Sequence, residues 1–191
     1  MEKYSLMIDV CTNDCAFVIF NNKKCEKIFY HTNKNLIDVM NDILNDLIKK
    51  VNIKYSDIDK IYLIYGPGSF TGVRAGLNLA KTIISIYPNI KLFIIDSLLA
   101  MNCGNGVAIL DAKGNKSYIN ISINNKIVQP TIMIDNDNLE EYLQKYQELP
   151  IFDADKLTIE DKINNLLKNL NLFTIVDDWL SLEPNYIKEP V

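Results

Sequence analysis

Tyr65-Gly-Pro-Gly-Ser-Phe-Thr-Gly-Val-Arg-Ala-Gly76 is the segment of this chain that decides its fold. The apolar run that leads into it, Lys60 to Tyr65, predicts a buried strand. The apolar residues that follow recur with helical spacing from Thr71 to Tyr87, and Pro88 ends that pattern. The sequence therefore predicts a strand, a short loop and a helix in immediate succession.

The loop itself has the residues of a tight turn at a helix N-terminus. Gly66 and Gly68 permit backbone conformations that other residues avoid, and Ser69 or Thr71 can cap the helix. Free N–H groups at such a terminus favour an anion. No Gly-Lys-Ser/Thr ends the loop, so it is not a Walker A loop, and Thr71 stands where a G-x-G-x-x-G motif has its third glycine. From these residues alone, a phosphate loop and a purely structural turn both stay open.

The periodic pattern extends in both directions from this segment. Strands and helices are predicted at 4–10, 15–21, 24–30, 36–51 and 91–95 in the first half, and at 106–111, 116–123, 126–134, 137–146, 149–152 and 158–170 in the second. Each half opens with an apolar strand that ends in Asp, at Asp9 and Asp111, before a turn and a hairpin strand. This weak repeat predicts an α/β protein with two lobes, each a mixed sheet with helices, by analogy with the actin/hexokinase/Hsp70-like (ASKHA) fold. The expected lobes are residues 1–98 and a smaller, shortened 99–191.

The composition argues against several classes of protein. The 191 residues are 48% hydrophobic and 23% charged, which is typical of a globular protein. The net charge is −4, and Arg74 is the only arginine, so the chain lacks the basic character of a protein that grips nucleic acid unaided. The apolar run Tyr4 to Val10 is too short for a signal peptide or a membrane span, which predicts a cytoplasmic protein without membrane contact. The four cysteines form no CxxC pair, and His31, the only histidine, leaves too few ligands for a zinc site.

The run from Gly66 to Gly76, with Leu79, Ala80 and Lys81 after it, resembles the signature segment of the TsaB family. Weaker similarities lie at Ile8-Asp9, Cys15 to Val18, Leu110 to Lys113 with Tyr118, and Leu182 to Lys188, so the resemblance extends along the whole chain. The chain departs from the family at Val10-Cys11-Thr12, where Thr-Ser usually follows the Asp, and at Asn33-Lys34-Asn35, where the family often has His-Ser-Glu. The chain is also shorter than is usual for the family, and we expect the missing residues to be in the second lobe.

This resemblance implies a pseudo-enzyme that has no catalytic residues, no metal and no cofactor. TsaB is similar in fold to TsaD, which transfers threonylcarbamoyl to the adenosine beside the anticodon of tRNAs that read codons beginning with A. The resemblance implies a heterodimer with a TsaD-like subunit, to which a TsaE-like ATPase is added. It implies that tRNA is met only through the complex, and that the free protein can form a homodimer.

Two predicted helices supply candidate partner-binding residues. Gly72, Gly76 and Ala80 recur every four residues and line one ridge of the second helix. The first helix has a wide apolar stripe, of which one side is Leu36, Met40, Ile43 and Leu47. We expect these two helices to pack side by side and to present a shared face to a partner, with a tightly packed internal core as the competing interpretation. Arg74, in the signature loop with Gly66, Pro67, Gly68, Ser69, Phe70 and Thr71, is expected to make a specific polar contact in the loop or to a partner.

Catalytic alternatives are weaker. Asp9 and Asp111 are candidates for vestigial cleft acids that hold Mg²⁺ through water, or for simple caps of strand-end turns. A small active kinase or phosphotransferase of the same fold would need a phosphate hairpin rich in Gly and Thr, whereas Asp9 is followed by Val10, and the only candidate adenosine loop is Cys103 to Gly106. A metalloprotease would need ligands that the chain does not have.

Overall fold

The structure, a computed structural model, describes residues 2–31 and 36–187. The departure at Asn33-Lys34-Asn35 and the final Lys188 of the C-terminal similarity lie outside these residues. The chain forms two compact units, Met1–Ile95 with Phe173–Pro184, and Asp96–Leu172 with Asn185–Val191. The second lobe was expected to include all of 99–191, whereas residues 173–184 return to the first unit.

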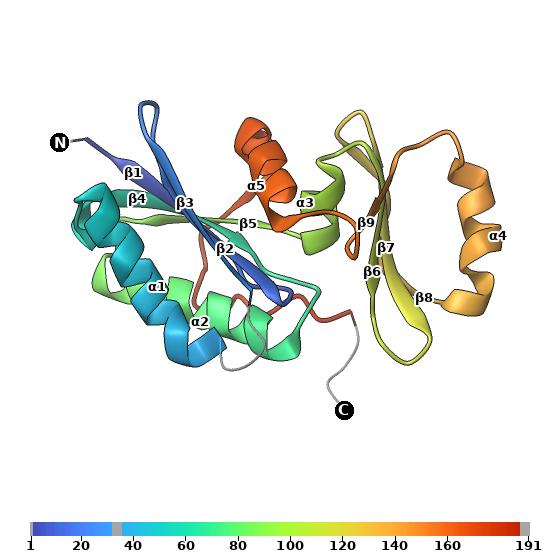
Figure 1. The fold of residues 1–191 in the computed structure, drawn as a ribbon, viewed down its shortest axis with the longest axis horizontal. Helices are drawn as coiled ribbons and strands as arrows, with labels where there is room; N and C mark the ends of the chain where they lie inside the picture. The colour runs from blue at the N-terminus through green and yellow to red at the C-terminus, as the bar shows by residue number, and fades with distance from the viewer. Residues whose placement is uncertain (1, 32–35, 188–191) are drawn as a thin grey trace. The chain divides into compact units, whose positions relative to one another are not determined.

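The first unit is built on a six-stranded mixed sheet (Figure 1). The strand order is β10-β5-β4-β1-β2-β3, with β1 at Tyr4–Asp9, β2 at Asp14–Phe20, β3 at Cys25–His31, β4 at Ile58–Ile64, β5 at Lys91–Ile95 and β10 at Thr174–Val176. Strand β1 is antiparallel to β2 and parallel to β4, and β4 is parallel to β5. Residues 173–184 belong to this unit because β10 pairs with β5 at the sheet edge.

Two long helices, α1 (Leu36–Val51) and α2 (Phe70–Ile86), pack side by side on one face of this sheet (Figure 1). Their apolar sides and the inward residues of β1, β2 and β4 form one continuous core, because alternate strand residues point to the same face. The short helix η1 (Tyr55–Asp57) leads into β4. The order strand, loop and helix around the signature segment is therefore confirmed.

The second unit repeats this topology on a smaller scale. Its sheet has the order β8-β7-β6-β9, with β6 at Gly106–Asp111, β7 at Lys116–Ile123, β8 at Lys126–Asp135 and β9 at Ile151–Asp153. Strand β6 is antiparallel to β7 and parallel to β9, as β1 is to β2 and β4. The helices are α3 (Ser97–Asn102), α4 (Leu139–Leu143) between the 3₁₀ turns η2 (Asn136–Asn138) and η3 (Gln144–Tyr146), and α5 (Ile159–Lys168), followed by η4 (Leu170–Leu172). The predicted internal repeat is thus present as a shared strand order.

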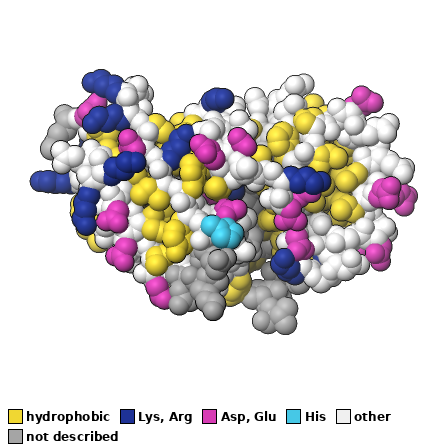
Figure 2. Space-filling view, viewed as in Figure 1, with side chains coloured by type: hydrophobic (Ala, Val, Ile, Leu, Met, Phe, Trp, Pro, Cys, Tyr) yellow, Lys and Arg dark blue, Asp and Glu magenta, His cyan; other side chains and the backbone are white. Residues whose placement is uncertain are grey.

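Charge is unevenly spread over the surface. In the space-filling view, lysine and arginine side chains gather over the end of the first unit where β1 begins, and acidic side chains lie among them as well as over the second unit (Figure 2). Within the described part of the chain, no helix is long and apolar enough to cross a bilayer.

Candidate partner-binding site

The signature segment holds the end of β1 through its backbone. Gly66 has φ 109°, and the Gly66–Pro67 peptide bond is cis, so the chain turns sharply after β4. The Ser69 N–H then donates to the Cys11 carbonyl at 2.7 Å, and the Ser69 hydroxyl caps α2 by accepting from the Gly72 N–H at 3.3 Å. Ser69, rather than Thr71, is therefore the N-cap of α2, and the loop is hydrogen-bonded to the β1–β2 turn.

Small residues let α2 lie directly against that turn. A Cβ atom on Gly68 would clash with the Cys11 carbonyl oxygen, and one on Gly72 would clash with the Val10 carbonyl oxygen. A Cβ on Gly76 would lie 2.6 Å from Val10 Cγ2. The glycines therefore exist to allow close approach of backbone to backbone.

This geometry corrects the prediction of a small-residue ridge that faces a partner. Gly72, Gly76 and Ala80 are buried inside the first unit. On α1, Leu36, Met40 and Leu47 also belong to the internal core, and Ile43 is only partly exposed. The competing interpretation, an internal core, accounts for most of these positions, because they are buried within the first unit; Ile43 is the partly exposed exception.

The turn after β1 does not form an open phosphate cradle. Asp9 is fully buried, and its Oδ1 accepts the Cys11 N–H at 3.2 Å. The Val10 side chain is fully buried, and Cys11 Sγ donates to the Ile64 carbonyl at 3.2 Å. Asp9 thus serves as a strand-end cap, and the backbone that a phosphate would have to approach is covered by Gly68 and Gly72.

Asp111 makes the same local contact in an exposed setting. Its Oδ1 accepts the Lys113 N–H at 2.7 Å, and its other oxygen pairs with the Lys113 ammonium. The hydrogen bond from the Lys113 ammonium, followed by the one from the Lys113 N–H, holds the pKa of Asp111 below its usual value. Across residues 2–31 and 36–187, no group of three His, Cys, Asp or Glu side chains is arranged to hold a metal ion.

The candidate adenosine loop after α3 is closed by its own contacts. The Asn102 side chain accepts the Gly104 N–H at 2.9 Å, and the Asn125 N–H donates to the Gly104 carbonyl at 2.9 Å. A side chain at Gly104, where φ is 81°, would meet Asn125 Oδ1. The two glycines here shape a tight turn between α3 and β6, which explains them without a nucleotide.

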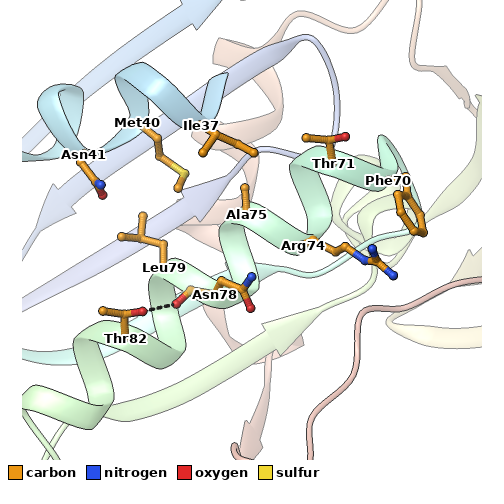
Figure 3. Close-up of a pocket in the computed structure, with 10 residues that line it drawn as sticks. All are labelled: Ile37, Met40, Asn41, Phe70, Thr71, Arg74, Ala75, Asn78, Leu79 and Thr82. Atoms are coloured by element: carbon orange, nitrogen blue, oxygen red, sulfur yellow. Dashed lines mark hydrogen bonds between the residues drawn. The ribbon is translucent and has the colours of Figure 1, made fainter. Parts of the chain in front are cut away.

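An open groove of about 490 Å³ runs between α1 and α2 on the outside of the first unit (Figure 3). Its lining comes from both helices: Ile37, Met40, Asn41, Phe70, Thr71, Arg74, Ala75, Asn78, Leu79 and Thr82. Apolar side chains form the middle, and neutral polar groups lie along its edges. Such a mixed, concave surface fits an amphipathic helix or a loop of another protein.

Arg74 and Phe70 form the end of this groove. The guanidinium carbon of Arg74 lies 3.8 Å from the centre of the Phe70 ring, so the two side chains stack in a cation–π contact. Among the described residues that line the groove, Arg74 is the only charged one. The planar, weakly hydrated guanidinium suits this position, and a lysine would stack less well.

The two exposed apolar residues of the groove were not among the predicted partner contacts, although Phe70 was part of the predicted signature loop. Ile37 is 53% exposed and Phe70 is 38% exposed. Ile37 belongs to the wide apolar stripe of α1, but on the side that the sequence did not select. Packing against the sheet needs only part of such a stripe. The extra width of the α1 stripe was therefore the sequence signal for an exposed apolar surface.

Three comparisons place these features among known proteins. The model of the family TsaD, described as tRNA N6-adenosine threonylcarbamoyltransferase, matches residues 30–163. An uncharacterised protein of Mycoplasma pneumoniae, the MG208 homologue, is 27% identical over 195 residues, which cover 100% of this chain and 97% of that protein. The tRNA threonylcarbamoyladenosine biosynthesis protein TsaB of Haemophilus influenzae is 21% identical over 91% of this chain and 72% of its own length.

A solved structure shows the same fold. An uncharacterised protein described as similar to the peptidase YEAZ from Pseudomonas aeruginosa superposes with a TM-score of 0.75, at 13% identity, over 97% of this chain and 100% of its own. The predicted fold class, an actin/hexokinase/Hsp70-like α/β protein with a mixed sheet and helices in each lobe, is confirmed. The family match covers well over half of the chain, and the chain therefore belongs to the TsaD family, in which it is TsaB-like.

Proposed function

We propose that this protein is a non-catalytic scaffold or activator subunit of the complex that forms threonylcarbamoyladenosine next to the anticodon of tRNAs that read codons beginning with A. It acts by binding a TsaD-like catalytic subunit in the cytoplasm. The observation that carries this proposal is the exposed groove between α1 and α2, which lies beside the signature segment of the family. A TsaE-like ATPase joins the assembly, and tRNA is met only within it.

The β1–β2 turn supports a non-catalytic role. In this fold the turn after the first strand is where a nucleotide-hydrolysing relative would hold phosphate. Here its backbone is covered by α2, Val10 fills the space beneath it, and Asp9 is used as a cap. A nucleotide could reach this turn only if α2 moved away from β1.

The groove replaces the small-residue ridge as the proposed partner surface. Ile37 and Phe70 keep a large exposed apolar area in a groove, which is the kind of feature that marks protein–protein contact sites. Self-association of the free protein through the same groove would cover this area when the partner is absent.

Replacement of Ile37 tests the surface. Ile37→Glu puts a charge into the apolar middle of the groove, and we expect at least a tenfold loss of affinity for the TsaD-like subunit, because the carboxylate would be desolvated without a partner. Co-purification, titration calorimetry and an assay of tRNA modification with the purified proteins measure the effect. The matched control is Ile86→Glu, because Ile86 is 64% exposed on α2 but does not line the groove. Equal behaviour of the two variants would rule out the groove as the contact surface.

Arg74 gives a finer test of the same site. Arg74→Lys keeps the charge but weakens the stack on Phe70 and removes the bidentate geometry. We expect weaker partner binding and less tRNA modification at nearly unchanged melting temperature. Full activity in Arg74→Lys would show that Arg74 is an ordinary exposed arginine.

Catalytic silence is tested on the protein alone. We expect no ATP turnover and no peptide hydrolysis by the isolated chain. Turnover above about 1 s⁻¹, the low end for typical enzymes, that disappears in Asp9→Ala would instead favour a kinase or phosphotransferase.

A further inference from the structure

Two lysines lie directly opposite each other at the end of the first sheet. Lys60 on β4 and Lys91 on β5 are register partners in the parallel pair. Lys60 is also the register partner of Ser5 on β1, which pairs in turn with Phe20 on β2. The two lysines therefore belong to a row that crosses the sheet at the level where β1, β4 and β5 begin.

Three more lysines extend this row toward the β2–β3 hairpin. Lys3 precedes β1 and donates to the Ser56 carbonyl, just before β4. Lys23 and Lys24 stand in the hairpin turn, and Lys23 pairs with Glu2 at 3.4 Å, which ties that turn to the start of β1. We name Lys3, Lys23, Lys24, Lys60 and Lys91 the lysine edge. All are exposed except Lys60, which is partly exposed.

The lysine edge spans the sheet of the first unit from the β2–β3 hairpin to β5. From the strand spacing of about 4.8 Å, the four steps from β3 to β5 cover roughly 19 Å. That length is enough to meet several consecutive phosphates of a nucleic acid backbone.

Few acids offset this charge. Glu2 is neutralised by Lys23, and Asp59 is the neighbour of Lys60 in the chain. The hydrogen bond and the charge of Lys23 lower the pKa of Glu2, so this carboxylate is tied to Lys23. None of the ion pairs formed by the described residues includes Lys60 or Lys91.

A like-charge pair in direct register costs stability. Sheets normally avoid it, and one exchange, Lys91 to Glu, would turn the repulsion into an attraction. The like-charge pair of Lys60 and Lys91, with three more lysines beside it, makes this end of the sheet a surface that suits a polyanion.

We infer that the lysine edge binds the phosphate backbone of tRNA when this chain is held in its complex. The inference rests on the proposed function, which brings tRNA to the assembly. The acidic overall balance explains why the isolated chain is expected to bind tRNA weakly: five lysines supply a useful increment of affinity only when a partner supplies the rest.

The next row of the sheet supports phosphate contact rather than base stacking. Tyr62 lies between Phe20 and Phe93, with ring centres 5.8 Å and 5.0 Å apart. Phe173 packs edge-on against Tyr62, which is only 7% exposed. Tyr62 is thus covered by its aromatic neighbours, so it braces the sheet beneath the lysines and offers no open face for a base.

The test uses the complex of this chain with its TsaD-like partner and a tRNA that reads a codon beginning with A. Binding is measured by titration at several salt concentrations. In Lys60→Gln/Lys91→Gln, loss of two phosphate contacts should make the slope of log K against log salt shallower by about 1.4 to 1.8. Affinity at physiological salt should fall several-fold. Lys60→Arg/Lys91→Arg should restore both.

The matched control is Lys126→Gln/Lys168→Gln, which removes the same charge from two exposed positions of the second unit. Partner affinity is measured separately for every variant, so that failure of the complex to form would refute the proposed function alone. An intact complex whose affinity and salt slope for tRNA match those of the control would overturn the inference. Weaker partner binding in Lys60→Gln/Lys91→Gln would also overturn it, because the lysine edge would then contact the protein partner.

Discussion

The two units share a strand order but treat their strand ends in opposite ways. In each, an Asp at the end of the first strand accepts the N–H two residues later, from Asp9 to Cys11 and from Asp111 to Lys113. In the first unit this turn is buried beneath α2, whereas in the second Asp111 stays exposed and pairs with a lysine. The hydrogen bond is the same in both turns, so the surrounding structure decides the role of each aspartate.

The helices that follow the matching strands explain the difference. Both are capped by a hydroxyl, Ser69 for α2 and Thr158 for α5. Only α2 has glycines where it approaches the turn, and α5 has none. Small residues at fixed positions, more than topology, allow a helix to seal the turn.

Charge shows a second contrast. In the second sheet Lys116 lies opposite Asp135, and the two form an ion pair at 3.6 Å. In the first sheet Lys60 lies opposite Lys91. The pair on β7 and β8 joins opposite charges, whereas the pair on β4 and β5 places like charges together, which is the arrangement expected of a surface that binds an anionic partner.

The largest effect is expected where the helix meets the turn. Gly72→Ala adds a Cβ that clashes with the Val10 carbonyl, so α2 has to shift, and we expect the free energy of unfolding to fall by about 1–3 kcal/mol or more. Urea unfolding followed by circular dichroism measures it. The control is Ser85→Ala at an exposed site of α2, for which we expect a change within about 0.5 kcal/mol. If Gly72→Ala were as stable as this control, the turn would not be sealed by contact.

The two aspartates give the next contrast. Asp9→Ala leaves the buried Cys11 N–H without its acceptor, and the expected loss of stability is about 1–3 kcal/mol. Asp111→Ala exposes the Lys113 N–H to water, so we expect a change of no more than about 0.5 kcal/mol. Parallel thermal and urea unfolding of both variants decides the matter. Losses of equal size would mean that burial does not distinguish the two turns.

A partly buried acid of the second unit, Asp96, predicts a pH dependence. Asp96 caps α3 by accepting from the Leu98 and Leu99 N–H groups, and it also accepts from the Asn185 side chain at 2.9 Å. Burial nevertheless raises the pKa of Asp96 above its ordinary value of 3.8. The native state therefore holds this proton more tightly than the unfolded chain does, and the stability so gained is lost as the pH rises through the raised pKa.

The variant Asp96→Asn isolates this contribution, since Asn is also a good cap. The free energy of unfolding of the natural protein should decline more steeply than that of the variant as the pH rises from 3.8 toward neutrality. Urea titrations at a series of pH values measure both curves. Parallel curves would show that Asp96 titrates alike in the folded and unfolded chain. Asp111, whose pKa is lowered, contributes with the opposite sign, and its exposure keeps that contribution small.

Much of this architecture was accessible from residue patterns, because periodicity and turn residues are local properties. The order of strands and helices, the loop before α2 and the repeat at Asp9 and Asp111 all follow from them. The direction in which a small residue faces is not local. Gly72 and Gly76 are equally compatible with a partner helix and with the neighbouring strand end, and only the approach of the Val10 carbonyl decides between them.

The groove and the lysine edge escaped prediction for a related reason. Ile37 lies at the start of α1 and Phe70 at the start of α2, so they are far apart in the sequence. The groove forms only because α1 and α2 lie side by side. Lys60 and Lys91 are thirty-one positions apart, and their pairing depends on the register of β4 and β5. Lys23 and Lys24 are the only adjacent pair in the lysine edge, and no longer run of basic residues marks this surface in the acidic sequence.

The smallest expected effect is the most diagnostic of the contrast in charge. Lys91→Glu converts the like-charge pair with Lys60 into an opposite-charge pair of the kind seen at Lys116 and Asp135. Cross-strand pairs of this kind contribute about 0.2–1 kcal/mol, so the isolated protein should become slightly more stable, by that order, with the gain shrinking at high salt. The complex should at the same time lose tRNA affinity, since one phosphate contact is replaced by a repulsion. Differential scanning calorimetry of the chain and tRNA titration of the complex measure the two changes. A variant that is both more stable and equally active would show that Lys91 is dispensable. A variant that gains stability while it loses tRNA affinity would show that the first unit gives up stability at this edge for the sake of binding.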